Sequence, residues 1–196
     1  LGSMHFNQPM VRSAAVVLTF CADINRFSKW CEMRDAKPEY DNFTWYYNAT
    51  IDAVLASQNA ALAAEHEGLG ICYLGTTIYT AEKIAEVLEL PHGVIPVTTV
   101  AIGYPDTTTE VPLTDRLPLE GVVHYQTYKD YTPEDINNIW REKEASQLTA
   151  SLLKDNDLPT LARIFTERRY KGSDNRAISR SLLEVAKSRG FMNNEE

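Results

Sequence analysis

A glycine-bounded segment in the middle of the chain constrains the fold most. Gly68 and Gly70 follow a long run of small residues, and a short apolar stretch then leads to Gly75. Gly68 can end a helix in the left-handed conformation that other residues avoid. The apolar stretch, residues 71–74, predicts a buried strand, and Gly75 would leave bare backbone at its end. A flat ligand could therefore approach the main chain closely at this point.

The composition predicts one hydrophobic core. With 196 residues, 44% of them hydrophobic, the chain can bury a core without disulfides or a metal ion. We expect a single domain over residues 1–196, in which residues 133–196 form a C-terminal helical extension. The net charge of −8 and the scattered positive residues argue against a nucleic-acid or anionic-membrane partner.

Cysteine usage and hydropathy bear on location. The three cysteines form no CxxC pair and lie in apolar surroundings, which favours reduced thiols in a cytoplasmic protein. No apolar run approaches membrane-spanning length, and the first residues lack a signal-peptide pattern. We therefore expect neither membrane insertion nor secretion.

Hydrophobic patterning predicts alternating helices and strands. The continuous apolar run at 16–22 predicts a strand covered on both faces and central in its sheet. An aromatic cluster at 43–47 favours core or subunit packing, and the alanine-rich helix that follows is expected to be buried nearly all round. The full set of expected elements is a short helix after Asp23, a helix at 49–67, strands at 71–74 and 94–102, a helix at 80–88, and two or three charged helices over 133–190.

Several common chemistries have no motif in this chain. The four histidines show neither HxxxH nor HExxH spacing, so surface or hydrogen-bonded core roles are favoured over metal binding. The chain has no G-x-S-x-G elbow, P-loop or G-x-G-x-x-G fingerprint, which disfavours a hydrolase or a dinucleotide-fold dehydrogenase. The remaining candidates are the backbone near Gly75 and an isolated Arg116.

An ordered set of short motifs runs along the chain from Gln8. As a set it resembles the flavin-dependent nitroreductase family, and its NADPH-preferring, flavin-reductase-like branch in particular. The resemblance implies a dimeric α+β fold whose mainly antiparallel central sheet is wrapped by helices. The motifs are Asp52-Ala53, Gln58-Asn59, Ala63-Ala64, Glu67-Gly68-Leu69-Gly70, Tyr73-Leu74-Gly75, Leu90-Pro91, Pro96-Val97, Ile102-Gly103-Tyr104-Pro105 and Arg116-Leu117-Pro118.

The resemblance also implies a cofactor and a reaction. In that family FMN lies at a homodimer interface, and hydride passes from NAD(P)H to the flavin and then to a nitroaromatic, a quinone or a free flavin. The cofactor carries the chemistry, so no side chain is expected to be catalytic. Tyr73, Leu74, Gly75 and Thr76 match the segment along the flavin ring. Thr76 replaces the second of two glycines common there, and its side chain would narrow the space through which the flavin ring approaches the backbone.

Other positions match cofactor-binding residues one at a time. Gln8 matches a glutamine that binds the flavin, with a solvent-facing loop amide as the alternative. Arg116 matches an arginine that contacts the FMN phosphate, while Thr114 stands where a lysine is often found. Lys171 and Arg176 fall where the branch has basic residues for the NADPH 2'-phosphate, although such helix faces are usually just solvated.

One family feature has no counterpart here. The family begins with two helices that carry an Arg-x-Ser-x-Arg-like motif, and nothing before Gln8 replaces it. We expect this chain to be a fragment of a longer protein rather than a degenerate member, and to bind FMN poorly as it stands. The alternative function is a non-catalytic flavin-binding or dimeric interaction protein of the same fold.

Overall fold

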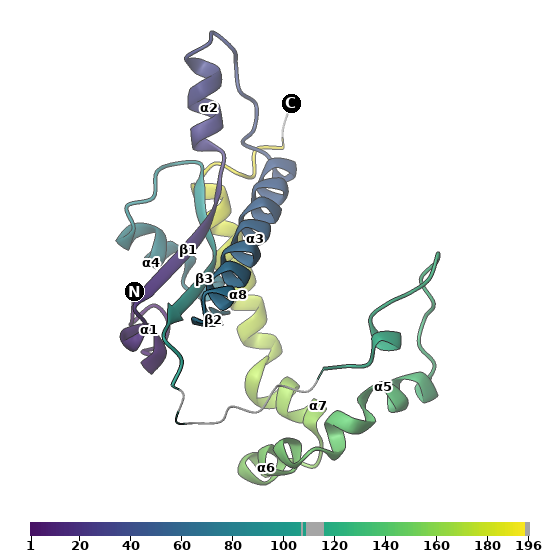
Figure 1. The fold of residues 1–196 in the computed structure, drawn as a ribbon. Helices are drawn as coiled ribbons and strands as arrows, with labels where there is room; N and C mark the ends of the chain where they lie inside the picture. Colours follow the sequence, from purple (N-terminus) through teal and green to yellow (C-terminus); the bar gives the residue numbers. More distant parts are fainter. Residues whose placement is uncertain (107, 109–115, 195–196) are drawn as a thin grey trace. The chain divides into compact units, whose positions relative to one another are not determined.

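The computed structural model describes residues 1–106, 108 and 116–194 (Figure 1). The chain divides into two compact units. We call residues 1–107 and 176–196 the sheet unit, and residues 108–175 the helical unit.

In the described part of the sheet unit, three antiparallel strands form one sheet. They are β1 (Val16–Asp23), β2 (Gly70–Leu74) and β3 (Val94–Gly103), in the order β1-β3-β2. This sheet and its helices confirm the predicted α+β class. The expectation that the first strand is central was wrong, because β3 pairs with both neighbours and β1 lies at an edge of this sheet. A continuous apolar run indicates that both faces of a strand are covered. It does not indicate how many neighbouring strands pair with that strand.

The long helix α3 (Phe43–His66) begins six residues earlier than predicted. Asn42 lies just before it in extended backbone, and its side chain accepts a hydrogen bond from the Trp45 N–H at 3.3 Å. An asparagine in this position satisfies one of the free donors of a first helical turn. The predicted aromatic cluster therefore forms the start of the helix rather than a separate segment.

The end of α3 follows the glycine signal in the sequence. Gly68 has a φ of +76°, which confirms the left-handed stop. The N–H of Leu69 donates to the carbonyl of Ala64 at 3.0 Å, and that of Gly68 to Glu65 at 3.0 Å. These two bonds form a Schellman motif, which satisfies the last carbonyls of the helix and delivers the chain into β2.

One face of α3 packs against the sheet. That face is small, which lets the helix approach β1 and β3 closely; its buried residues are Ala49, Ala53, Ser57, Ala61 and Ala64. Val54, Leu55 and Leu62 lie elsewhere on α3 with 47%, 59% and 54% of their surface exposed. The expectation that α3 is buried nearly all round was therefore wrong for the single chain.

Short helices complete the sheet unit. They are α1 (Pro9–Ser13), α2 (Asn25–Glu32), the 3-10 turn η1 (Thr77–Tyr79) and α4 (Ala81–Val87). The long α8 (Gly172–Ser188) begins in the helical unit and ends in the sheet unit. Its last turns join one hydrophobic core, which comprises Ala22, Ile24, Ala49, Ala81, Ile95, Val185, Ala186 and Phe191.

The helical unit contains η2 (Leu119–Gly121), α5 (Pro133–Ala145), α6 (Gln147–Asn156), α7 (Leu161–Ile164) and the π-turn η3 (Phe165–Arg169). Thr132 and Asp135 form a capping box, which confirms the predicted helix start. Ser146 separates α5 from α6 and accepts a hydrogen bond from the Thr149 N–H. Among the described residues, no helix is long and apolar enough to cross a membrane.

Candidate functional site

The turn after β2 presents open backbone. β2 ends at Leu74, whose side chain is 1% exposed, and the next residue, Gly75, is exposed. A Cβ built on Gly75 would meet no atom within 4 Å, so the main chain faces free space there. Gly75 and Thr76 lie outside the helices and strands. Among the described residues, no backbone carbonyl accepts a hydrogen bond from either of their N–H groups. The turn can therefore offer donors to the edge of a planar ligand.

The side chains beside this turn point elsewhere. Tyr73 directs its hydroxyl to α3, where its oxygen lies 3.2 Å from Ser57 Oγ and 3.5 Å from Gln58 Oε1. The Leu74 side chain is buried in the unit. Both residues could then contact a ligand at this turn mainly through backbone, which agrees with the sequence-based emphasis on bare main chain.

Thr76 is held by a histidine to which no role in the site was assigned from the sequence. Thr76 is 9% exposed, His5 is 0% exposed, and Thr76 Oγ1 lies 2.8 Å from His5 Nδ1. Burial lowers the pKa of His5, so the neutral imidazole is favoured. Among the described residues, His5 Nε2 has no hydrogen-bond partner. The prediction of a hydrogen-bonded core role is confirmed for this histidine.

Gln8 follows the same N-terminal turn. It occupies the residue before α1, where its side chain makes no capping hydrogen bond. Its backbone N–H donates to the His5 carbonyl at 3.1 Å. The side-chain amide is partly exposed and remains a candidate ligand contact.

Arg116 belongs to the helical unit and lines a cavity of about 460 Å³. Lys143 and Glu142 of α5 line the same cavity, so two cations and one carboxylate meet there. An excess of one positive charge suits a phosphate group, because Arg presents a fixed fork of donors and Lys a point charge. Thr114 lies outside the described residues.

Lys171 and Arg176 flank the start of α8. Lys171 lies just before the helix, and its carbonyl accepts the Asn175 N–H at 3.0 Å. Both basic side chains are exposed, and neither is in an ion pair with a described residue. They are accessible to a ligand, and equally to solvent.

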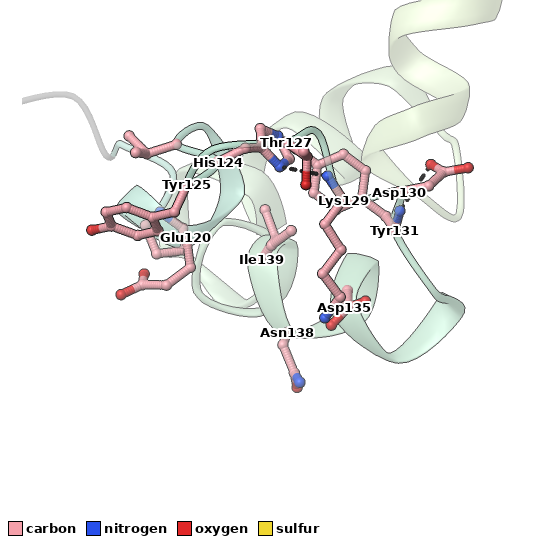
Figure 2. Close-up of a pocket in the computed structure, with 12 residues that line it drawn as sticks. Glu120, His124, Tyr125, Thr127, Lys129, Asp130, Tyr131, Asp135, Asn138 and Ile139 are labelled. Atoms are coloured by element: carbon pink, nitrogen blue, oxygen red, sulfur yellow. Dashed lines mark hydrogen bonds between the residues drawn. The ribbon is translucent and has the colours of Figure 1, made fainter.

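A second cavity of the helical unit, about 770 Å³, adjoins the Arg116 cavity, because Pro118, Asn138 and Ile139 line both (Figure 2). His124 Nδ1 accepts the Lys129 N–H at 3.3 Å, and His124 Nε2 lies 3.1 Å from the Tyr131 hydroxyl. Gly121 lets the segment approach α5, since a Cβ there would lie 2.8 Å from Ile139. No local pattern in the sequence predicted this cavity, because its lining comes both from the loop at 118–131 and from α5.

The described residues hold no group of three or more His, Cys, Asp or Glu side chains that could bind a metal ion. The three cysteines are free, and Cys31 is buried. Burial raises the pKa of Cys21 to about 11, with a further rise from Asp23 nearby, so this thiol stays protonated near neutral pH.

Comparison with known proteins identifies the family. Residues 2–104, just over half of the chain, match the model described as "Nitroreductase family". The chain therefore belongs to the nitroreductase family, as the resemblance of its motifs predicted. The match contains Gln8 and the whole turn after β2.

Individual relatives agree with this. The chain is 36% identical to "FMN reductase (NADPH)" of Bacillus subtilis over 134 residues, 65% of this chain and 51% of the relative. A putative oxidoreductase of Bacteroides fragilis has a solved structure with a TM-score of 0.94 and 47% identity, covering 98% of this chain and 78% of that one. An "NADPH:FMN oxidoreductase" of Vibrio harveyi complexed with NAD⁺ gives a TM-score of 0.75 at 26% identity, covering 98% and 74%. The chain spans about half the length of the curated relatives it matches.

Proposed function

We propose that this chain is part of an FMN-dependent NAD(P)H oxidoreductase that reduces nitroaromatics, quinones or flavins. The open backbone at Gly75, inside a segment that matches the nitroreductase family, carries the proposal. Names of relatives add support: two Bacillus subtilis relatives are FMN reductases, and a Salmonella typhimurium relative is an oxygen-insensitive NADPH nitroreductase. A cytoplasmic location, which the three unpaired cysteines favour, is part of the proposal.

The residues of the turn after β2 fit the ring portion of FMN. The N–H groups of Gly75 and Thr76 would donate to polar atoms at the ring edge, and the absence of a Cβ at Gly75 would let the ring lie close. Gln8 would add an amide contact from the segment before β1. When bound, FMN would supply the redox chemistry, taking a hydride from NAD(P)H and reducing the second substrate in a ping-pong cycle.

Arg116 would hold the phosphate end of FMN. Its guanidinium remains charged at every physiological pH and can donate two parallel hydrogen bonds to phosphate oxygens. Lys143 lines the same cavity and would contribute further positive potential. Lys171 and Arg176 would attract the 2'-phosphate of NADPH, which would favour NADPH over NADH.

The exposed apolar face of α3 supports a homodimer. Ile51, Val54, Leu55 and Leu62 are 40% to 59% exposed on one helix, and Phe43 and Tyr47 are exposed at its start. A contiguous apolar surface on a monomer commonly marks an interaction site. A second copy of this chain would cover it, since a twofold dimer uses the same patch on both partners.

A variant at Gly75 tests the proposed function. In the complete protein, Gly75→Val would fill the free space beside the main chain and should lower FMN affinity by at least tenfold. NADPH oxidation with a quinone should fall in proportion to the bound flavin.

Ile78→Val is the control, because it trims an exposed side chain of η1 and leaves the glycine turn intact. Wild-type protein that binds FMN but oxidises no NAD(P)H would favour the non-catalytic alternative. Unchanged flavin affinity in Gly75→Val would contradict the placement of the ring.

A further inference from the structure

We propose that His5 is a positioning residue: through Thr76 it fixes the turn after β2 and links that turn to the segment carrying Gln8. The inference rests on the proposed function, because it assigns the flavin ring to this turn. It adds a residue that the sequence motifs did not single out. It also assigns a structural role to Thr76, which occupies the position where the family often has a second glycine.

Three contacts join the N-terminal turn to the turn after β2. His5 Nδ1 lies 2.8 Å from Thr76 Oγ1, and Thr80 Oγ1 donates to the Met4 carbonyl at 2.9 Å. The rings of Phe6 and Tyr79 lie 6.4 Å apart between their centroids. Residues 4, 5 and 6 thus each meet one residue of 76–80. Of the two hydrogen bonds, the His5 bond lies fully inside the protein.

The N-terminal turn is held in an uncommon backbone conformation. Phe6 and Asn7 have φ values of +54° and +55°, in the left-handed region that residues with a side chain rarely adopt. Two such residues in succession persist only where the surrounding contacts hold them. Arg12 Nη2 donates to Asn7 Oδ1 at 2.7 Å, and the contacts with 76–80 hold the other end. Gln8 follows this turn as the residue just before α1, so its position depends on the same contacts.

The hydrogen bond to His5 orients Thr76 from the inside. The carbonyl of Thr76 accepts the Tyr79 N–H at 3.0 Å, and its hydroxyl is fixed by His5. With both groups engaged, Thr76 is held in one orientation next to Gly75. A neutral imidazole can take either role with the hydroxyl, since one ring nitrogen donates and the other accepts.

A double-mutant cycle in the complete protein tests the pair. His5→Leu and Thr76→Val each delete the hydrogen bond while keeping similar bulk, and each should weaken FMN binding by about tenfold. The double variant should be no weaker than either single variant, because the same bond is lost. Each variant should also shift the visible absorption of the bound flavin, since the donors at the ring edge move. Thr76→Ser keeps the hydroxyl and should restore affinity and spectrum.

Thr19→Val is the matched control. It deletes a threonine contact of the same unit, the one between Thr19 Oγ1 of β1 and Thr99 Oγ1 of β3 at 3.2 Å, and neither residue belongs to the N-terminal turn or to the turn after β2. It should lower stability and leave the flavin spectrum unchanged. If His5→Leu does not fold, the comparison of Thr76→Val with Thr76→Ser still gives the answer.

The outcomes separate this inference from the proposed function. Additive effects of the two substitutions, or an unchanged flavin spectrum in both, would overturn the positioning role while leaving the flavin protein intact. Wild-type protein that binds no FMN would overturn both. Coupling seen in unfolding free energy, without any coupling in flavin affinity, would reduce His5 to a structural residue.

Discussion

Replacing Leu55 on α3 should separate the proposed homodimer into monomers. Leu55 keeps 59% of its surface exposed in the single chain. Fully burying a leucine is worth about 1.5–3 kcal/mol, so covering the remainder is worth about 1–2 kcal/mol per copy. Because Leu55 of each partner is buried in a twofold interface, the two copies together stabilise the dimer by about 2–4 kcal/mol. Leu55→Asp removes this term and adds an unpaired charge at the interface.

The dimer dissociation constant should therefore rise by about 30- to 1,000-fold or more. Sedimentation velocity over a series of concentrations measures the shift directly. Val87→Asp is the matched control, because Val87 on α4 is 51% exposed and lies off the α3 face. A wild-type monomer at high micromolar concentration would refute the reasoning, as would equal effects of the two substitutions.

Three further predictions concern the phosphate contact, pH and packing. Arg116→Ala in the complete protein should weaken FMN binding by about 1.5–3 kcal/mol, about ten- to a hundredfold. Isothermal titration calorimetry measures this affinity, and an unchanged value would show that Arg116 does not contact the phosphate. Because burial holds the folded-state pKa of His5 below its ordinary value of 6.5, the unfolded chain binds a proton first as pH falls. Stability should then decline as pH drops below about 6.5, and less steeply in His5→Asn; parallel denaturation curves for the two proteins at every pH would contradict this. Gly121→Ala, whose Cβ would lie 2.8 Å from Ile139, should cost about 1–3 kcal/mol in urea unfolding, whereas Gly75→Ala, which meets nothing, should cost little; equal losses would refute the packing argument.

Local signals in the sequence predicted the elements whose causes are local. Gly68 predicted the end of α3 because a positive φ there needs no help from distant residues. Thr132, followed by a proline and acidic residues, predicted the start of α5 for the same reason. Asn42 carried an equally local signal, but the neighbouring proline segment made it look like part of a break.

Features that depend on distant pairing could not be predicted in this way. β1 lies at an edge because β3 pairs with both other strands, and no pattern within residues 16–23 reports that choice. His5 and Thr76 are 71 residues apart, so neither spacing nor periodicity indicates their hydrogen bond. The open backbone at Gly75 was predicted because both its causes, the strand before it and the missing side chain, lie within one short segment.

The most direct test of the account is the visible absorption spectrum of the complete protein, followed during addition of NADPH. We predict that the purified protein carries FMN, or takes it up stoichiometrically, and that NADPH bleaches the flavin band without another enzyme present. A quinone or nitroaromatic should then restore the band. A protein that stays colourless at saturating FMN, or whose bound flavin NADPH cannot reduce, would contradict the central claim.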